Sequence, residues 1–405
     1  MTGRQSKRLI GALDIGTAKI ACLICEVEGW DVRAFGLGHQ RSRGVSAGVI
    51  TDAAEAEAAI RAAVAQAERA TGMTLAEVYV SMSCGRLASL SFAAHAQVGS
   101  NGVIEADVAR LHEGARAYAE RDGRALVHMN TLAYRLDGEL GGENPIGMAG
   151  AKLTADLHAV TADEGAIRNI LHVVERCHLT VAGLIAAPYA SALAVTTQDE
   201  RRLGVSVIDM GGGTTNWATF GAGNLVQCAG FATGGHHLTF DIAQNLRISL
   251  AEAERIKALY ASIVNAKSDV SDRFVYAIPG DGEDGAGQTT RAQLSEYVRP
   301  RMETLLRSVM AHLPPARDGG QVVLTGGASQ LVGLVAFASQ VLARPVRLGR
   351  PLQVSGSTTG ADSPAFATAV GLALAAPDGD AGRTQHRRPA QGYLSRVGRW
   401  IGSGL

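Results

Sequence analysis

Two glycine-containing turns, one in each half of the chain, constrain the fold more than any other feature. The first reads DIGTAK at residues 14–19 and the second reads DMGGGTTN at 209–216. Each follows a short apolar run and precedes another, a pattern typical of a β-hairpin. The second turn begins about half a chain length after the first. We therefore expect a duplicated α/β fold with one such hairpin in each half.

The residues in these turns are suited to binding phosphate. Glycine lets backbone N–H groups approach an anion that a Cβ atom would hold away. Asp14 and Asp209 are placed to hold Mg²⁺ through its water ligands, as this ion prefers. Other candidate phosphate contacts are Gly16, Thr17, Lys19, Gly211, Gly212, Gly213, Thr214 and Thr215. One such turn alone indicates only a hairpin, but the pair predicts a phosphate site between the halves.

Two further glycine pairs extend this prediction to a nucleotide. Gly326 and Gly327, followed by Ala328, lie between a predicted strand and a predicted helix, where backbone amides suit a phosphate. Gly234 and Gly235 precede another predicted helix, over 238–261. Glu254 and Lys257 share one face of that helix and would flank a ribose and adenine. A tight strand–helix connection and a surface ion pair remain the simpler alternatives for these features.

Strand and helix patterns alternate along the chain, which indicates an α/β fold. Asp52 is the expected N-cap of an alanine-rich helix that ends near Ala70. The pattern changes to short β-like runs around one helix between 84 and 163, which indicates an inserted α+β module. The expected units are 1–83 with 164–200, the module 84–163, 201–237 with 316–376, a small unit at 238–315, a linker at 377–391 and a terminal helix at 392–405.

Charge and cysteine content exclude several functional classes. Lysine and arginine total 38, as do aspartate and glutamate, so the formal net charge is zero and we expect no nucleic-acid partner. The segment after Asp380 carries arginines and no acid, which favours an anionic surface as its partner. Five scattered cysteines do not predict a disulfide framework, and Cys22 and Cys25 are expected to be buried in a strand.

The last fourteen residues, GYLSRVGRWIGSGL, have the pattern of a helix that lies in a membrane surface. At helical spacing Leu394, Val397, Trp400 and Ile401 fall on one face, and Arg396 and Arg399 lie toward the other. Docking onto the protein's own body is the alternative. The polar linker before the segment and its lack of acidic residues favour the membrane.

Taken in order, these motifs resemble the FtsA family of bacterial cell-division proteins, within the actin/Hsp70/sugar-kinase superfamily. The resemblance runs from about Leu9 to Leu374 and includes DIGTAK, NPIGMAGAKLTADLHAVTA, LGVSVIDMGGGTTN and VVLTGGASQLVGL. It implies an actin-like ATPase fold with a small FtsA-type insert (SHS2-like) in the first half. It also implies ATP and Mg²⁺ as ligands, held by the glycine turns listed above together with Asn216.

The resemblance further implies a cytoplasmic protein at the division site, peripheral on the inner face of the membrane. Its expected partners are the C-terminal peptide of FtsZ, bound at about 240–315, other copies of the same chain in a filament, an anionic membrane surface and later divisome proteins. A small-molecule kinase of the superfamily and an actin-like scaffold of a pilus or secretion system are the alternatives. The kinase would need a catalytic acid or base that Ala187 does not offer.

Two positions depart from the pattern of the resembling proteins. Asn216 stands where they often carry an aspartate beside the phosphates. Ala187 stands before Pro188, where bacterial actins often carry a glutamate that orients the attacking water. Without a group to position or deprotonate water, a contribution of about 10²–10⁴ to the rate is missing. We therefore expect tight ATP binding with slow or negligible hydrolysis, and no catalytic residue.

Overall fold

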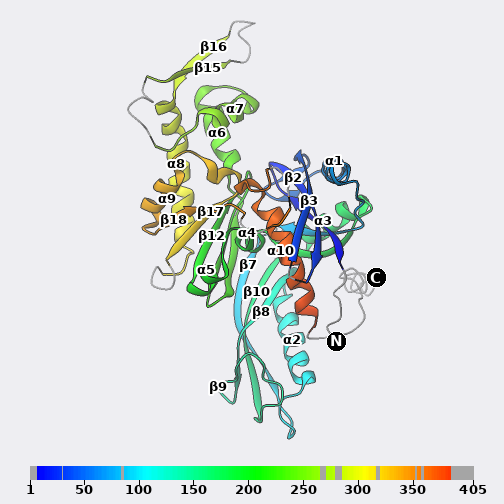
Figure 1. Ribbon diagram of the computed structural model, residues 1–405. Helices are drawn as coiled ribbons and strands as arrows, with labels where there is room; N and C mark the ends of the chain where they lie inside the picture. The colour runs from blue at the N-terminus through cyan, green and yellow to red at the C-terminus, as the bar shows by residue number, and fades with distance from the viewer. Residues whose placement is uncertain are drawn as a thin grey trace.

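The computed structural model of this 405-residue chain describes residues 7–29, 31–83, 86–264, 271–278, 285–315, 320–351, 354–356 and 360–384, with side chains to Ala376. Two sheets lie side by side in the centre, each beside its own helices (Figure 1). A lobe built from β7, β8, β10 and α2 extends below them. A second lobe, built from α6, α7, α8 and the β15–β16 hairpin, extends above the second sheet (Figure 1).

The first central sheet has the strand order β11-β6-β1-β2-β3. Its strands are β1 (Arg8–Ile15), β2 (Lys19–Glu28), β3 (Asp31–Arg41), β6 (Glu77–Met82) and β11 (Thr180–Ala186). β1, β2 and β3 form an antiparallel meander, whereas β6 pairs in parallel with β1 and β11 in parallel with β6. DIGTAK therefore forms the turn between β1 and β2, as predicted. Cys22 and Cys25 are both buried in β2, also as predicted.

The second central sheet repeats this topology. Its order is β14-β13-β12-β17-β18, with β12 (Val205–Met210), β13 (Thr215–Gly221), β14 (Asn224–Phe231), β17 (Gln321–Thr325) and β18 (Val346–Leu348). Again three strands form an antiparallel meander, and two follow in parallel. The duplicated α/β fold predicted from the two turns is confirmed, because each turn joins the first two strands of its own sheet.

Helices cover and join the two sheets. α1 (Ala53–Thr71) packs on β3 and begins at Asp52, whose side chain accepts from the Glu55 N–H at 2.9 Å, which confirms the predicted N-cap. α3 (Glu164–Arg176) contacts α1, and α4 (Ala187–Val195) packs against α10 (Ala367–Thr384) between the sheets. The remaining central elements are β4 (Val45–Ser46), β5 (Val49–Ile50), α5 (Gln198–Leu203), η4 (Gly327–Gln330), α9 (Leu334–Leu342) and η5 (Pro364–Phe366).

The lower lobe is a separate four-stranded sheet inserted between β6 and α3. Its order is β7-β10-β8-β9, from β7 (Ala88–Gln97), β8 (Arg124–Leu136), β9 (Glu139–Leu140) and β10 (Lys152–Asp163). α2 (Glu105–Ala119) packs on it, and the lobe has its own small core around Leu111, Leu153 and Leu157. The upper lobe contains α6 (Gly235–Leu246), α7 (Leu250–Tyr260), α8 (Arg291–Met310) and the hairpin of β15 (Arg273–Ala277) with β16 (Ala286–Thr290).

Two helix boundaries differ from the predicted ones. The helix expected over 238–261 is two helices, because Arg247 adopts a left-handed conformation with φ of 55° and Ser249 then caps α7. Residues 377–384, expected to open the linker, are helical instead, since α10 continues past Pro377 to Thr384. The alanine-rich segment before Pro377 supplies strong helix formers, and this proline does not end the helix. The predicted terminal helix 392–405 lies outside the described residues.

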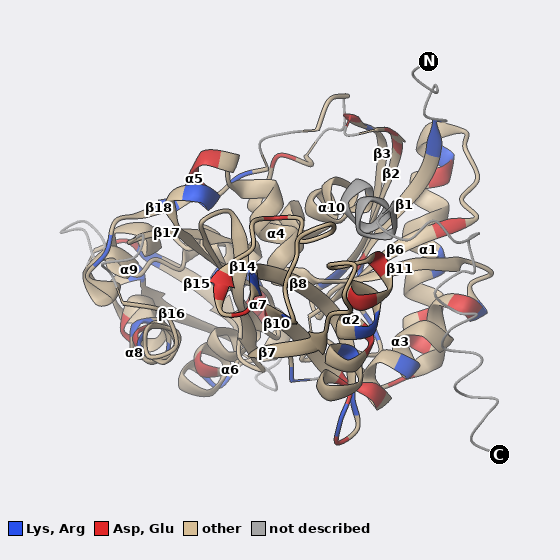
Figure 2. Cartoon of the chain, turned by 90° about the horizontal axis from the view of Figure 1, so that it is seen from below, with Lys and Arg blue, Asp and Glu red and all other residues tan. Residues whose placement is uncertain are grey.

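Charged side chains of both signs are distributed over the outer helices. Seen from below, blue and red segments occur together on α1, α3 and α5 (Figure 2). This mixing agrees with the zero formal net charge. Across the described residues, no helix combines the length and the hydropathy needed to cross a bilayer.

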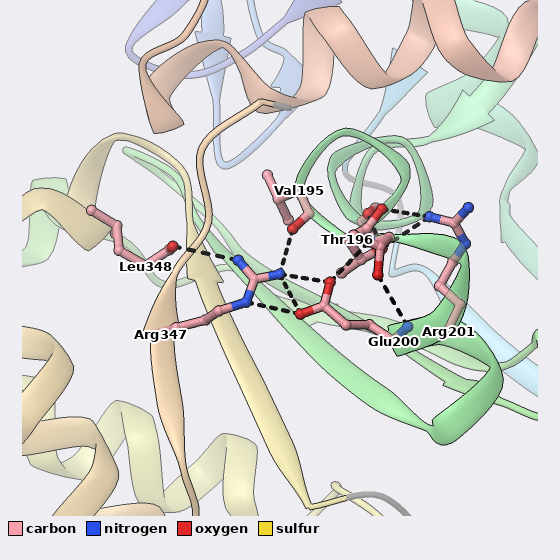
Figure 3. A network of polar contacts seen from close by, with 8 residues as sticks. Val195, Thr196, Glu200, Arg201, Arg347 and Leu348 are labelled. Carbon is pink, nitrogen blue, oxygen red and sulfur yellow. Dashed lines mark hydrogen bonds and ion pairs between the residues drawn. The ribbon is translucent and has the colours of Figure 1, made fainter. Parts of the chain in front are cut away.

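A polar network joins the two halves where α4 ends. Arg347 of β18 donates to Glu200 of α5 through Nε at 3.0 Å and Nη2 at 2.7 Å, and to the Val195 carbonyl at 2.7 Å (Figure 3). Arg201 donates to the Thr196 carbonyl at 2.7 Å (Figure 3). Burial alone would raise the pKa of Glu200, but hydrogen bonds from Thr197 and Arg347 hold that pKa below its ordinary value.

Candidate functional site at the meeting of two hairpins

The first hairpin places Asp14 and Lys19 on opposite sides of a tight turn. The Gly16 N–H donates to the Lys19 carbonyl at 3.1 Å and closes the turn. Asp14, at the end of β1, is buried, and the Ser81 hydroxyl donates to its Oδ1 at 2.8 Å. Thr17 lies at the tip, where its Oγ1 accepts from the Gly48 N–H at 2.9 Å. A Cβ atom on Gly16 would lie 2.9 Å from the Lys19 carbonyl oxygen, so this tight turn requires glycine at that position.

The second hairpin repeats this geometry with more glycine. The Gly211 N–H donates to the Thr214 carbonyl at 2.8 Å and closes the turn. Asp209, on β12, is buried and accepts at Oδ2 from Thr368 at 3.1 Å and from Ser191. Each hairpin therefore holds one buried aspartate fixed by hydroxyl groups from other elements.

The tips of the two hairpins are in contact. A Cβ atom added to Gly213 would lie 2.5 Å from the Thr17 Oγ1, and one added to Gly212 would lie 2.8 Å from the Ala18 Cβ. Any side chain at either glycine would therefore push the tips apart. Two turns that begin half a chain apart therefore meet in the fold.

Lys19 lies close enough to both aspartates for its charge to interact with each of them. Its ammonium group interacts electrostatically with both Asp14 and Asp209, donates to the Ala365 carbonyl, and lies 4.6 Å from the Phe366 ring centroid. Burial raises the pKa of both carboxyl groups and lowers the pKa of Lys19. Carboxylates in such a place favour a cation, because it would offset the cost of keeping them charged.

The third glycine turn adjoins the second hairpin. Gly326 follows β17, which pairs in parallel with β12, so the turn lies beside Asp209. Gly326 has φ of +84°, and a Cβ there would lie 2.6 Å from the Met210 carbonyl oxygen. Its N–H donates to the Pro364 carbonyl at 3.1 Å. Gly327 and Ala328 then begin the short helix η4.

The start of α6 lies beside both the second hairpin and the third glycine turn. The Gly235 N–H donates to the Gly211 carbonyl at 2.9 Å, and Gly234 is the N-cap residue. A Cβ atom on Gly235 would lie 3.2 Å from the Ala328 Cβ, so α6 and the third turn are neighbours. The three predicted glycine segments of the second half therefore surround one location.

Glu254 and Lys257 connect α7 to the start of α6. Lys257 Nζ donates to Glu254 at 2.7 Å, to Thr239 at 2.8 Å and to the Gly235 carbonyl at 3.1 Å. Hydrogen bonds from Lys257 and Thr239 outweigh burial and lower the pKa of Glu254. The pair is more than a surface ion pair, because it is bonded to the helix end that adjoins the second hairpin.

Several residues of the site were not identifiable from the sequence. Ser81, Ser191 and Thr368 hold the two aspartates, and Ala365 accepts from Lys19. Ser81 is the next-to-last residue of β6, whose parallel pairing with β1 brings the two carboxyl ends together. The strand pattern at 76–83, which indicates that β6 belongs to the same sheet as β1, was the one available sequence signal for Ser81. Ser191 and Thr368 lie on helices and carry no local motif.

Three positions that the sequence analysis singled out, Thr215, Asn216 and Ala187, are buried, which limits their contact with a ligand. Thr215 is fully buried in β13, and its hydroxyl has no hydrogen-bond partner among the described residues. Asn216 is buried opposite Gly230 of β14 and donates to the Thr214 Oγ1 at 3.2 Å. Ala187 is the first residue of α4 and is buried, so this helix start presents no carboxylate there.

The donor set fits a magnesium-bound nucleotide. The carboxyl groups of Asp14 and Asp209 are buried and interact with one ammonium group, that of Lys19, and the glycines let the backbones of the two tips meet without side chains between them. Mg²⁺ prefers one or two carboxylates together with waters and substrate phosphates. The residues present therefore match the expected group on both its cationic and its anionic side.

Comparison with known proteins assigns the chain to a family. The model of the "Cell division protein FtsA" matches residues 206–371, and that of the "SHS2 domain inserted in FTSA" matches residues 85–161. Cell division protein FtsA of Agrobacterium fabrum is 38% identical over 98% of this chain and 95% of its own length. The chain belongs to the FtsA family. The FtsA proteins of Neisseria meningitidis (33% identical, 98% of this chain, 99% of its own) and Escherichia coli K12 (32%, 92% and 91%) agree.

Solved structures related to this FtsA-family chain confirm the actin-like fold. The PilM–PilN type IV pilus biogenesis complex matches with a TM-score of 0.66 at 16% identity, over 91% of this chain and 98% of that one. MreB5 of Spiroplasma citri, solved bound to ADP, matches with a TM-score of 0.55 at 14% identity, over 94% and 99%. At these identities the likeness concerns the fold alone.

Proposed function

We propose that this FtsA-family chain binds ATP between its two hairpins and uses it as a structural switch. The observation that carries the proposal is the direct contact of the two hairpin tips, at Thr17 and Gly213. Beside this contact, the charge of Lys19 interacts with two buried aspartates, one from each hairpin. A triphosphate held there touches both halves, so its presence or absence changes how the halves sit together. Gly326, Gly327 and Ala328 would contact the α-phosphate side, and Glu254 with Lys257 the nucleoside.

Magnesium would be held by Asp14 and Asp209 through its waters. Bound Mg²⁺ supplies charge neutralisation between the phosphates. The chain's own residues then set the geometry, since Ser81 fixes one carboxylate and Ser191 with Thr368 fixes the other. Lys19, Thr17 and the backbone amides of Gly212 through Thr214 orient the phosphates.

We infer that hydrolysis is slow. Ala187 begins α4 without a side chain to orient or deprotonate water, and Asn216 is turned toward Thr214 and β14. A missing general base removes about 10²–10⁴ in rate. Phosphate release from purified protein at rates typical of polymerising actins would contradict this inference.

The physiological role we propose is a membrane tether for FtsZ at the division site, on the cytoplasmic side of the membrane. The terminal segment 392–405 would lie in an anionic membrane surface, and the unit at 238–315 would take the FtsZ C-terminal peptide. Exposed apolar side chains support docking on this unit, namely Phe240, Leu250, Leu259 and Val275. We also propose that further copies of the chain assemble with it into a filament and that it recruits later divisome proteins. The two halves and the inserted lobe are the structural units of this proposal.

Co-sedimentation tests this role against its alternatives. Purified protein is mixed with anionic liposomes and FtsZ, with and without ATP. We expect the protein to carry FtsZ into the lipid pellet, and FtsZ lacking its C-terminal peptide to stay in the supernatant. A superfamily kinase would sediment with neither, and a pilus scaffold would not retain FtsZ. Failure to bring FtsZ to lipid under any nucleotide condition would contradict the tether.

A further inference from the structure

A histidine that the proposed nucleotide site has not used lies at the meeting point of the two hairpins. His236 is the second residue of α6, and its N–H donates to the Gly212 carbonyl at 2.7 Å. Its ring Nε2 lies 3.1 Å from where a Cβ on Gly212 would sit, and the Ala18 Cβ of the first hairpin lies 2.8 Å from the same point. The imidazole therefore borders the same small space as both tips.

The His236 ring does not serve the fold in the way its neighbour does. His237 accepts from the Gly234 N–H at its Nδ1, at 3.2 Å, and so caps the start of α6. Neither ring nitrogen of His236 has a hydrogen-bond partner among the described residues, and the side chain is half-buried. A partly desolvated ring with both nitrogens uncommitted is available to a ligand.

The charges around His236 come from three elements. Burial is the largest influence and lowers its pKa, and Lys257 of α7, His237 of α6 and Arg41 of β3 act in the same direction. Glu254 of α7 opposes them. The net effect holds the pKa below its ordinary value of 6.5, so the ring is mainly neutral at pH 7. A polyanion placed beside Gly212 would reverse this balance, because negative charge favours the imidazolium.

We propose that His236 contacts the phosphates of the bound nucleotide and takes up one proton from solvent when the nucleotide binds. This inference rests on the proposed ATP site and adds a residue that none of the glycine motifs contains. The complex then binds more protons than the free protein. Affinity must therefore rise as pH falls toward the pKa of the free ring, and the gain is lost at a pH above the pKa of the bound ring.

Calorimetric titration with Mg²⁺ and the ATP analogue AMPPNP tests this proposal. Titrations at about pH 6.5 and pH 8, each in two buffers with different enthalpies of ionisation, give both the affinity and the number of protons taken up. The variants are His236→Asn, His236→Gln as a second version in case the first folds poorly, and His172→Asn. His172 is exposed on α3 and serves as the matched control.

We expect His236→Asn to bind about tenfold more weakly than the unmodified protein at pH 6.5, the size of a lost hydrogen bond to a charged group. The difference should shrink at pH 8, and the variant should take up fewer protons than the unmodified protein, whereas His172→Asn should match it. Equal proton uptake and equal affinity in both His236 variants would overturn the inference. If the unmodified protein does not bind AMPPNP, the proposed function itself fails, and the inference fails with it.

Discussion

At the scale of single residues, the site depends on hydroxyl groups that hold two buried aspartates in place. Asp209 Oδ2 accepts from both Ser191 and Thr368, each on a different helix. The two hydroxyls fix the carboxylate toward the hairpin, and they keep its charged form hydrogen-bonded although burial raises its pKa. If Asp209 holds Mg²⁺ through water, as proposed, these hydroxyls would keep its carboxylate in one orientation for that role.

Replacing Thr368 by Val removes one of these hydrogen bonds while keeping the shape of the side chain. We expect Thr368→Val to weaken Mg²⁺–AMPPNP binding about tenfold, the effect of losing a hydrogen bond of about 1.5 kcal/mol to a charged group. Thr304→Val is the matched control, because the Thr304 hydroxyl donates only to a carbonyl of its own helix at 2.9 Å. Equal affinities for the two variants in calorimetry would show that the Thr368 hydroxyl does not position Asp209.

The sequence predicts the motif residues of this site but not the residues that support them. Asp14, Lys19 and Asp209 stand in recognisable turns, and the structure brings them together. Ser81, Ser191 and Thr368 could not be anticipated in the same way. Each meets its aspartate only through packing of elements that are remote in sequence, and a serine or threonine in a strand or helix is otherwise unremarkable.

At the scale of elements, α5 and β18 are joined by a part-buried ion pair that crosses from one half to the other. Arg347 binds Glu200 through two of its nitrogens and also donates to the carbonyl that ends α4 (Figure 3). Two parallel hydrogen bonds to one carboxylate give both strength and a fixed direction. The end of α4 is thereby held against the second sheet.

Removing this arginine should destabilise the protein more than removing an exposed one. We expect Arg347→Leu to lower the free energy of unfolding by about 1–3 kcal/mol, because Glu200 and the Val195 carbonyl lose their partner in a part-buried place. Arg307→Leu is the control, since Arg307 pairs with Glu303 on the exposed face of α8, and such pairs contribute about 0.3–0.5 kcal/mol. Urea denaturation compares the two, and equal losses would refute the structural role of the network.

Helix existence was predictable from the sequence, whereas helix ends were less so. Asp52 identifies the start of α1 because the cap is a local interaction. The break between α6 and α7 was missed, since Arg247 in a left-handed conformation carries no glycine or proline signal. The continuation of α10 past Pro377 was also missed. Proline usually interrupts a helix, so it predicted an end that the structure does not have.

At the scale of the whole molecule, the inserted lobe is hydrogen-bonded to both halves through one strand. On β8, His128 accepts from the Ala186 N–H of the first half at 2.9 Å, and Asn130 donates to the Leu225 carbonyl of the second half at 3.2 Å. The ring of His158 on β10 joins this contact: its Nδ1 lies 3.3 Å from the Asn130 Oδ1, and its Nε2 lies 3.0 Å from the Ser89 Oγ. A change in the relative orientation of the two halves would therefore act on this lobe through these hydrogen bonds.

Acid should loosen this junction. Burial lowers the pKa of His128 and of His158 to about 4, whereas an unfolded chain has the ordinary value of 6.5. The unfolded state takes up protons first, so the stabilisation is complete above about pH 6.5 and is lost as pH falls through 4. We expect the unmodified protein to lose on the order of 2 kcal/mol more than His158→Gln between pH 7 and pH 4.5 in urea denaturation. A His172→Gln control should keep the full loss, and parallel pH profiles for the unmodified protein and His158→Gln would contradict the assignment.

The attachment of the whole molecule to a membrane is proposed to depend on its terminal segment. Trp400→Glu places a charge on the apolar face of the predicted interfacial helix, and we expect it to release the protein from anionic liposomes in flotation assays. Trp400→Phe keeps an apolar ring and should retain binding. Undiminished flotation of Trp400→Glu would show that the membrane contact lies elsewhere.

The central claim is that one nucleotide is held by both hairpins at once, and a crystal structure of the protein with Mg²⁺ and AMPPNP tests it most directly. The measurement is the set of distances from the phosphate oxygens to the backbone nitrogens of 17–18 and of 212–214, which form no hydrogen bond across their own turn. We predict hydrogen-bond distances to both turns in a single site, with Asp14 and Asp209 facing the metal. A nucleotide that contacts only one turn, or that binds in another place, would contradict the account.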